Sequence, residues 1–149
     1  MSYVRIWVHL VFTTKNREPL LLLNEVRKRV IEHIQYNSKM KNIWLDSING
    51  QKEHIHCLIL LNKEQSISKV AQMIKGESSY WINKNKLIKS RFEWQDDYFA
   101  VSISESQVDK VRAYIANQEE HHRKKSFTEE VEEFMKKYGF KIWDGSKNG

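Results

Sequence analysis

The sequence predicts an α+β fold in which helices pack on an antiparallel sheet. Runs rich in β-branched and aromatic residues alternate with runs whose apolar residues recur at three- and four-residue steps, in the order β-α-β-β-α-β-α-α. Asn49-Gly50, between the second and third strand runs, is a typical hairpin turn signal. Two βαβ-like halves joined by a hairpin form a ferredoxin-like split βαβ sandwich, here with extra C-terminal helices.

The N-terminal half is expected to contain three strands and one helix. Residues 3–13 form a β-branched and aromatic run, which predicts a buried strand in the centre of the sheet. From Asn24, which is a suitable N-cap, apolar residues recur at helical spacing. The strands at 43–49 and 54–61 would flank the turn at Asn49-Gly50 and form the hairpin.

The C-terminal half is expected to be mainly helical. A helix at 66–85 would be capped by Ser66 or Ser68, and a fourth strand at 98–104 alternates apolar and polar residues. Ser104 would cap a third helix reaching about residue 124, and a short final helix would follow at 127–138. We expect one domain at 1–143 and a short tail at 144–149.

Composition restricts the classes of protein that fit. A chain of 149 residues suits one domain, and a net charge of +6 admits a nucleic-acid partner without establishing one. The single cysteine, Cys57, cannot form an internal disulfide, which excludes a cysteine-based zinc site and fits a reducing compartment. Neither an apolar run of ~20 residues nor a secretory signal pattern is present, so we expect a cytoplasmic protein without a membrane partner.

Two histidines in the third expected strand are the first candidate site. Side chains at i and i+2 on a strand share a face, so His54 and His56 project together while Ile55 points to the other face. Two neutral imidazoles on one face can begin a divalent metal site. A pair of exposed or hydrogen-bonded strand histidines would give the same pattern, so both interpretations stay open. His9 is expected to be a strand residue with a local partner.

Tyr114 and Gln118, one turn apart on the third expected helix, are the second candidate site. In many helices such a tyrosine only packs against the core and such a glutamine only meets solvent. If this helix lies near the histidines, however, a metal bound by two imidazoles and an amide oxygen would polarise a phosphoryl group. That would assist a phenol, a poor nucleophile at its ordinary pKa of ~10, in covalent attack on a phosphodiester.

Basic residues gather around the first loop and the second expected helix, with tryptophans among or beside them. Lysine and arginine neutralise phosphates, and an aromatic ring can stack on an unpaired base. A solvated helix face with core tryptophans would give the same pattern. The candidate DNA-binding residues are Lys15, Arg17, Lys69, Lys75, Trp81 and Arg91.

These residues resemble those of the single-tyrosine HUH transposases of the IS200/IS605 type and the related REP-associated tyrosine transposases. His54-Ile55-His56 looks like the His-hydrophobe-His motif, Tyr114 matches the nucleophile and Gln118 matches the third metal ligand. The similarity covers roughly residues 3–125 in matching order and includes Ile74-Lys75-Gly76. Lys52-Glu53 differs from the acidic pair of many members, although Glu53 keeps a negative charge.

The resemblance implies a Mg²⁺- or Mn²⁺-dependent strand transferase that acts on single-stranded DNA. Tyr114 would attack the scissile phosphate, form a 5′-phosphotyrosine link and free a 3′-hydroxyl that can later reverse the step. His54, His56 and Gln118 would hold the metal. Members of the family recognise DNA hairpins near the ends of the element and form dimers in which active sites can be shared, so hairpin DNA and a homodimer are the expected partners.

Two other functions compete with this one. A catalytically silent module that binds DNA or RNA hairpins is the alternative, but binding alone requires none of the four site residues His54, His56, Tyr114 and Gln118. A nucleotide hydrolase of the histidine-triad kind needs a further histidine two residues after His56, and Leu58 occupies that position.

Overall fold

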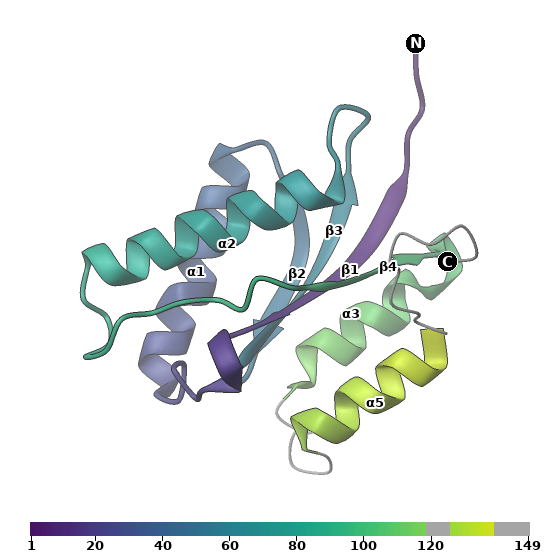
Figure 1. The fold of residues 1–149 in the computed structure, drawn as a ribbon. Helices are drawn as coiled ribbons and strands as arrows, with labels where there is room; N and C mark the ends of the chain where they lie inside the picture. The colour runs from purple at the N-terminus through teal and green to yellow at the C-terminus, as the bar shows by residue number, and fades with distance from the viewer. Residues whose placement is uncertain (119–125, 139–149) are drawn as a thin grey trace, which may run out of the picture. The chain divides into compact units, whose positions relative to one another are not determined.

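The protein is represented by a computed structural model that describes residues 1–118 and 126–138 (Figure 1). The chain divides into two compact units, Met1–Gln118 and Glu119–Gly149. In the second unit the described element is the helix α5 (Phe127–Tyr138), at the residues predicted from the sequence. The expected end of the third helix at 119–124 and the expected tail at 144–149 lie outside the described residues, and the boundary at 143 stays a prediction.

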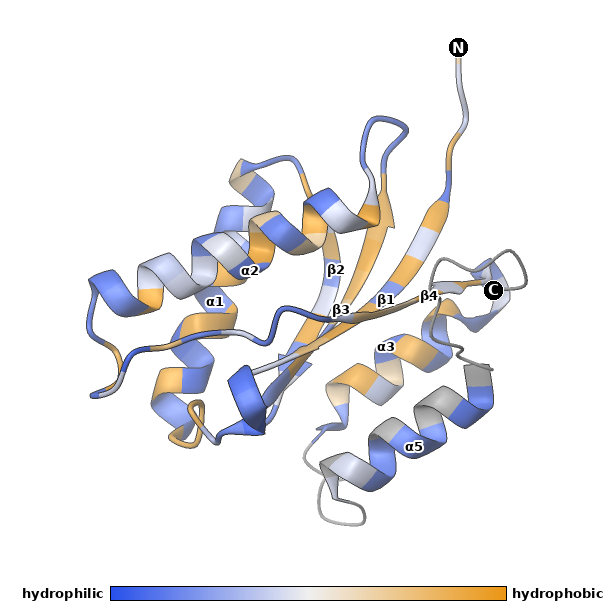
Figure 2. Ribbon diagram, in the orientation of Figure 1, coloured by the Kyte–Doolittle hydropathy of each residue, from blue (hydrophilic) through white to orange (hydrophobic). Residues whose placement is uncertain are grey.

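The first unit contains a four-stranded antiparallel sheet in the order β2-β3-β1-β4. The strands are β1 (Ile6–Thr13), β2 (Trp44–Gly50), β3 (His54–Leu61) and β4 (Phe99–Ile103). β1 and β3 are the central strands, so the prediction that the first strand is central is confirmed. Figure 2 shows that hydrophobic residues dominate these two strands.

Helices lie on both sides of the sheet (Figure 1). On one side are α1 (Asn24–Met40) and α2 (Ile67–Lys84); on the other is α3 (Val108–Ala116), which follows the short 3₁₀ helix η2 (Glu105–Gln107). The predicted order of strands and helices, and with it the α+β class, is confirmed. Within the described residues, no helix has the length and apolar character needed to cross a membrane.

The alternation of side chains along the strands gives the sheet two different faces. The face under α1 and α2, here called the core face, carries the buried apolar residues Val8, Leu10, Phe12, Ile55, Cys57, Ile59 and Leu61. The face towards α3, here called the site face, carries their neighbours in sequence, which are Trp7, His9, Val11, Thr13, His54, His56 and Leu58. Because these positions alternate, one sequence places a hydrophobic core and a polar cluster on the two sides of the same strands.

The β2–β3 hairpin is confirmed, but the prediction that Asn49-Gly50 forms its turn is wrong. Both residues belong to β2 and pair with His56 and Ile55, and the turn follows them, closed by the Gln51 N–H donating to the His54 carbonyl at 2.9 Å. A Cβ on Gly50 would lie 2.5 Å from the His54 carbonyl oxygen. Gly50 is therefore required because β2 and β3 approach closely here, and not because of a turn conformation.

The predicted helix caps had mixed outcomes. The Ser66 hydroxyl accepts a hydrogen bond from the Lys69 N–H at 3.3 Å, so Ser66 caps α2 as predicted. Asn24 is the first residue of α1 and follows the N-cap Leu23, and its side chain instead accepts from Arg27. Ser104 makes no side-chain capping bond and precedes the 3₁₀ turn η2.

Candidate active site

The two histidines of β3 lie side by side on the site face. In the antiparallel register His54 pairs with Thr13 and His56 with Val11, so both stand in the middle of the sheet. Their exposed fractions are 0% and 2%, and their ring centroids are 5.0 Å apart. A ligand nitrogen of one ring lies within 4.8 Å of a ligand nitrogen of the other. The strand thus places the two imidazoles together, as the i, i+2 spacing requires.

Each imidazole is oriented by a hydrogen bond at its Nδ1 atom. His54 Nδ1 is 2.7 Å from Glu53 Oε1, and because an ionised carboxylate can only accept, Nδ1 carries the hydrogen. His56 Nδ1 is 2.9 Å from His9 Nε2, across the boundary between β3 and β1. Metal-binding histidines characteristically make such a bond with the nitrogen that does not bind the ion. The Nε2 atoms are therefore the ligand atoms that this arrangement presents.

Gln118 joins this cluster just after the end of α3. Its side chain is completely buried, and its Oε1 atom lies 3.2 Å from His54 Nε2. When a neutral His54 donates from Nδ1 to Glu53, its Nε2 and the amide oxygen are both acceptors, and two facing acceptors repel unless a proton or a cation lies between them. Within the described part of the chain, the Gln118 amide nitrogen also has no hydrogen-bond partner.

The chemistry of these donors fits a divalent metal site. Two buried imidazole nitrogens supply the neutral ligands that transition-metal ions accept, and an amide oxygen is a hard donor of the kind that Mg²⁺ and Mn²⁺ prefer. Glu53, at 5% exposure, adds the carboxylate behind the first imidazole. The buried His54–His56 pair can therefore hold a divalent ion, and Gln118 is placed to add an oxygen ligand.

Tyr114 lies against the same histidines in the same chain. Its ring centroid is 5.5 Å from that of His56 and 6.1 Å from that of His9, with the rings edge to face. The side chain is half-buried. The structure therefore brings together the four residues that the sequence analysis proposed as catalytic and metal-binding: His54, His56, Tyr114 and Gln118.

α3 is fixed on the sheet by apolar contacts and by an ion pair. Val108, Val111 and Ile115 form its buried side. The Arg112 guanidinium donates from Nε and Nη2 to the two carboxylate oxygens of Asp46 on β2, each at 2.9 Å. This hydrogen bonding holds the pKa of Asp46 below its ordinary value. Such a two-pronged contact fixes the rotation of the helix as well as its position.

The C-terminal end of α3 is also held from β2. The Asn49 side-chain amide donates to the Ile115 carbonyl at 3.0 Å and to the Ala116 carbonyl at 3.3 Å. The last carbonyl groups of a helix have no partner within the helix, so a side-chain donor at this place stabilises the end. Since Tyr114 and Gln118 flank these two residues, Asn49 helps to set the position of both.

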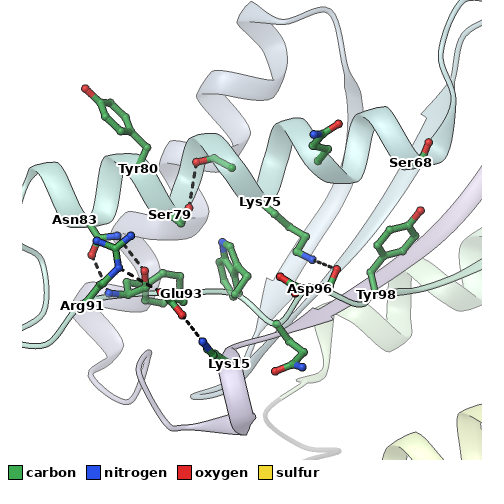
Figure 3. Close-up of a pocket in the computed structure, with 15 residues that line it drawn as sticks. Lys15, Ser68, Lys75, Ser79, Tyr80, Asn83, Arg91, Glu93, Asp96 and Tyr98 are labelled. Atoms are coloured by element: carbon green, nitrogen blue, oxygen red, sulfur yellow. Dashed lines mark hydrogen bonds and ion pairs between the residues drawn. The ribbon is translucent and has the colours of Figure 1, made fainter.

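The six predicted DNA-binding residues have different surroundings in the structure. Lys15, Lys75 and Arg91 line a groove between α2 and residues 91–98 (Figure 3). Arg17, at the end of the 3₁₀ helix η1 (Lys15–Arg17), lines another cavity of about 420 Å³ that includes Thr13 and Phe99.

The other two residues lie outside the groove. Lys69 is exposed near the start of α2. The Trp81 ring is stacked on His33 of α1, with a centroid distance of 3.9 Å and an interplanar angle of 5°. That ring is thus already in contact with another aromatic group.

Several supporting residues were not singled out as site residues from the sequence. Glu53, Asn49 and Asp46 orient the histidines or α3, and His9 has the local partner expected for it, which proves to be His56. The role of His9 could have been predicted, because strand alternation places it on the same face of β1 as Val11 and Thr13, which pair with the two histidines of β3. Asn49 was missed because the dipeptide Asn49-Gly50 is typical of a turn.

The chain is similar to a known protein family and to two solved structures. A family model described as IS200-like transposase matches residues 2–118. A structure described as a candidate transposase from Deinococcus radiodurans R1 is 21% identical, with a TM-score of 0.63 and coverage of 79% of this chain and 95% of that chain. A REP-associated tyrosine transposase bound to a REP hairpin is 17% identical, with a TM-score of 0.61 and coverage of 82% and 72%.

The two solved structures share the fold of this chain, which confirms the predicted α+β architecture. No functionally curated protein matches the chain. The family model, in contrast, spans both histidines of β3, Tyr114 and Gln118. Because it matches most of the sequence, the chain belongs to the IS200-like transposase family.

Proposed function

We propose that this transposase nicks and rejoins single-stranded DNA through a covalent 5′-phosphotyrosine intermediate formed on Tyr114. The observation that carries the proposal is the position of the Tyr114 ring, with its centroid 5.5 Å from that of His56, in a chain where Gln118 Oε1 is 3.2 Å from His54 Nε2. The residue proposed as nucleophile and the residues proposed as metal ligands thus lie close together on one side of the sheet, which supports the proposal. A protein that only binds hairpins needs no such convergence.

The reaction proposed for Tyr114 is a transesterification. The phenolic oxygen attacks the scissile phosphorus, and the new O–P bond forms as the bond from phosphorus to the 3′-oxygen breaks. The phenolic proton passes to solvent, and the leaving 3′-oxygen takes up a proton to become a 3′-hydroxyl. Because one phosphodiester replaces another, a 3′-hydroxyl can reverse the step without a further source of energy.

His54, His56 and Gln118 are proposed to hold Mg²⁺ or Mn²⁺ at this point. A bound divalent ion would withdraw charge from the phosphoryl group, which is worth several kcal/mol in the transition state. Glu53 and His9 would keep the two imidazoles in the orientation that presents Nε2. Burial of the histidines keeps competing water away from these ligand atoms.

Hairpin DNA is the proposed substrate. The REP-associated relative was solved with a REP hairpin, and this chain shares its fold and carries a net charge of +6. Lysine and arginine side chains would contact the phosphates, which predicts binding that weakens as salt increases. The residues proposed for these contacts are Lys15, Arg17, Lys69, Lys75 and Arg91, with Trp81 as a stacking residue.

The decisive experiment is the capture of the covalent intermediate. The protein is incubated with Mg²⁺ and a labelled hairpin oligonucleotide that carries single-stranded flanks, and the products are separated on a denaturing gel. Wild type should give a protein–DNA adduct, and Tyr114→Phe should lose it while binding stays within a few-fold. Tyr36→Phe is the matched control, since Tyr36 is an exposed tyrosine on α1. An adduct that persists in Tyr114→Phe would remove Tyr114 from this role, and a wild type without an adduct would favour a silent binding module.

The metal site has an independent test that needs no DNA. Titration of the protein with Mn²⁺, followed by electron paramagnetic resonance, should show one tight site that His56→Ala loses. His33→Ala serves as the control, because His33 lies on α1 and bonds to Glu77 on α2. Equal Mn²⁺ binding by wild type and His56→Ala would contradict the assignment.

A mixing experiment tests how chains share the site. The expected homodimer could use a tyrosine from either chain, and in this structure the Tyr114 ring lies beside the His56 of its own chain. We therefore propose that each chain completes its own site. His56→Ala mixed with Tyr114→Phe should then form no adduct, whereas recovery of the adduct would show that tyrosines act in the partner subunit. Light scattering of the wild type measures the homodimer itself.

A further inference from the structure

The groove between α2 and residues 91–98 lies outside the histidine cluster, and three of the residues proposed to contact DNA, Lys15, Lys75 and Arg91, line it. It encloses about 770 Å³, and Figure 3 shows Lys75 and Tyr98 along one part of it and Lys15, Arg91 and Glu93 along another. Backbone hydrogen bonds join its wall to the end of β1, since the Gln95 N–H donates to the Thr13 carbonyl at 2.8 Å. Thr13 in turn pairs with His54 on its other side.

Gly76 lines this groove at a position where a glycine is not expected. It lies inside α2, where glycine is the least favourable residue except proline. A Cβ at this position would meet no atom of the described residues within 4 Å, and its φ lies outside the left-handed region. Neither close packing nor backbone conformation therefore requires a glycine. What the missing side chain provides is open space in the groove, above the helix backbone.

The walls of the groove combine an aromatic ring with paired charges. Lys75 Nζ lies 5.8 Å from the centroid of the Tyr98 ring and donates to the Asp96 carbonyl at 2.8 Å. Lys15 Nζ lies 2.9 Å from a Glu93 oxygen, and Arg91 Nε lies 3.3 Å from the other. Because these cations already pair with oxygen atoms of the protein, contacts with phosphate alone do not account for the groups that line the groove.

Such a mixture of groups fits a nucleobase. An unpaired base presents flat faces that stack on aromatic rings, and edges that carry both donors and acceptors. Amides, carboxylates and ammonium groups can match those edges, whereas a phosphate would use only the cations. Burial lowers the pKa of Lys75, so its ammonium group is already partly stripped of water.

We propose that this groove binds one unpaired nucleobase of the DNA substrate, with the base seated over Gly76 and beside Tyr98. The proposal rests on the function proposed above and adds a recognition site to it. Neighbouring strands are ~4.8 Å apart, so the wall at Gln95 lies about two strand spacings from His54 across Thr13. The groove lies on the α2 side of the sheet and the histidines face α3, so DNA that reaches both would pass around the edge of the sheet at Gln95.

The test measures the binding of oligonucleotides in which unpaired nucleotides are made abasic one at a time. Fluorescence anisotropy with the full-length protein, in the Tyr114→Phe background so that no cleavage occurs, gives the affinity for each oligonucleotide. Gly76→Leu fills the space over the helix with a good helix former. Met73→Leu introduces the same side chain one turn earlier on α2, at an exposed position outside the groove.

We expect one abasic position to lower the affinity by about tenfold in the Tyr114→Phe protein, as the loss of one stacked base does. Gly76→Leu should bind the intact oligonucleotide about tenfold more weakly and show no further loss with that abasic oligonucleotide. Its melting temperature should stay level or rise by about 3 °C, because leucine favours the helix. Met73→Leu should bind like its parent.

Two results would contradict the proposal that the groove binds a base. Wild-type-like affinity of Gly76→Leu would show that nothing needs the space, and an abasic penalty that persists in Gly76→Leu would place the base elsewhere. If Gly76→Leu melted early, Gly76→Met, whose unbranched side chain also fills the space but adapts more easily to its neighbours, would give the same comparison. These outcomes are separate from the fate of the proposed chemistry, since an adduct can form without the groove and the groove can bind DNA without Tyr114.

Discussion

The two faces of one sheet show how this chain separates stability from chemistry. On β3, His54 and His56 point to the site face, and Ile55 between them is fully buried on the core face. On β1, Phe12 belongs to the core while Thr13 and Val11 pair with the two histidines. The period of two along a strand allows neighbouring residues to serve different purposes.

The faces also differ in how burial is tolerated. Apolar residues on the core face gain about 25 cal/mol for each Å² removed from water. A buried imidazole gains little in this way and must be hydrogen-bonded, which the pairs His54–Glu53 and His56–His9 achieve. Substitutions on the core face should therefore act on folding, and substitutions on the site face mainly on metal and DNA.

The largest expected effect is on the core face. Phe12 is fully buried and makes an edge-to-face contact with Trp94, with ring centroids 4.7 Å apart. Phe12→Ala should lower the free energy of unfolding by about 3–5 kcal/mol, measured by urea denaturation. His56→Ala, only 2% exposed on the other face, should cost less folding stability yet lose metal binding. A larger loss of stability in His56→Ala than in Phe12→Ala would contradict the division between the faces.

The next largest effect is expected at Gly50, which lies against His54 of the site face and Ile55 of the core face. Its missing side chain allows the His54 carbonyl and the Ile55 Cδ1 to approach to 2.5 Å from the position of a Cβ. Gly50→Ala should therefore lower the free energy of unfolding by about 3 kcal/mol and also weaken Mn²⁺ binding, because relief of the clash must move His54. Gly76→Ala is the matched control, since its methyl group meets open space. Equal melting temperatures for the two variants would refute this explanation of Gly50.

The fold could be predicted from the sequence largely because the periodicities are local. β3 at 54–61 and α5 at 127–138 begin and end at the predicted residues, since the apolar patterning that predicts each of them lies within the segment itself. The prediction of a turn at Asn49-Gly50 was wrong for a reason that is not local in sequence. Asn49 donates to the carbonyl of Ile115, which is distant in sequence, and Gly50 is required because β3 lies too close to allow a side chain.

The candidate site could be predicted only as separate fragments. Spacing placed His54 with His56, and Tyr114 with Gln118, but not the two pairs beside each other. Their approach depends on the position of α3, which the Arg112–Asp46 pair sets through contacts that no spacing rule reveals. The basic residues illustrate the same limit, because sequence proximity did not reveal that Trp81 stacks on His33.

A smaller effect is expected at Glu53, which contacts one of the proposed metal ligands. Glu53 accepts from His54 Nδ1 and holds the imidazole so that Nε2 faces Gln118. Glu53→Ala should weaken Mn²⁺ binding by about tenfold, about 1.4 kcal/mol, whereas Glu53→Gln, which retains an acceptor, should weaken it less. Titration with Mn²⁺ measures both variants. If Glu53→Gln lost as much affinity as Glu53→Ala, the negative charge and not the orientation of the ring would be responsible.

The smallest effect concerns the attachment of α3, which includes an ion pair with the sheet. The pKa of Asp46 is lowered chiefly by its hydrogen bonds from Arg112, so the pair contributes stability above the ordinary pKa of an aspartate, ~3.9, and loses it as the pH falls through the lower folded value.

Asp46→Asn should therefore lower the melting temperature by a few degrees at pH 7, and its difference from wild type should shrink steadily below pH 4. Asp109→Asn is the control, because Asp109 also contacts Arg112 but its side chain is 91% exposed, where an ion pair contributes little. A difference between Asp46→Asn and wild type that stays constant from pH 7 into the acid range would show that the carboxylate charge does not hold α3, and that its apolar side alone keeps Tyr114 beside the histidines.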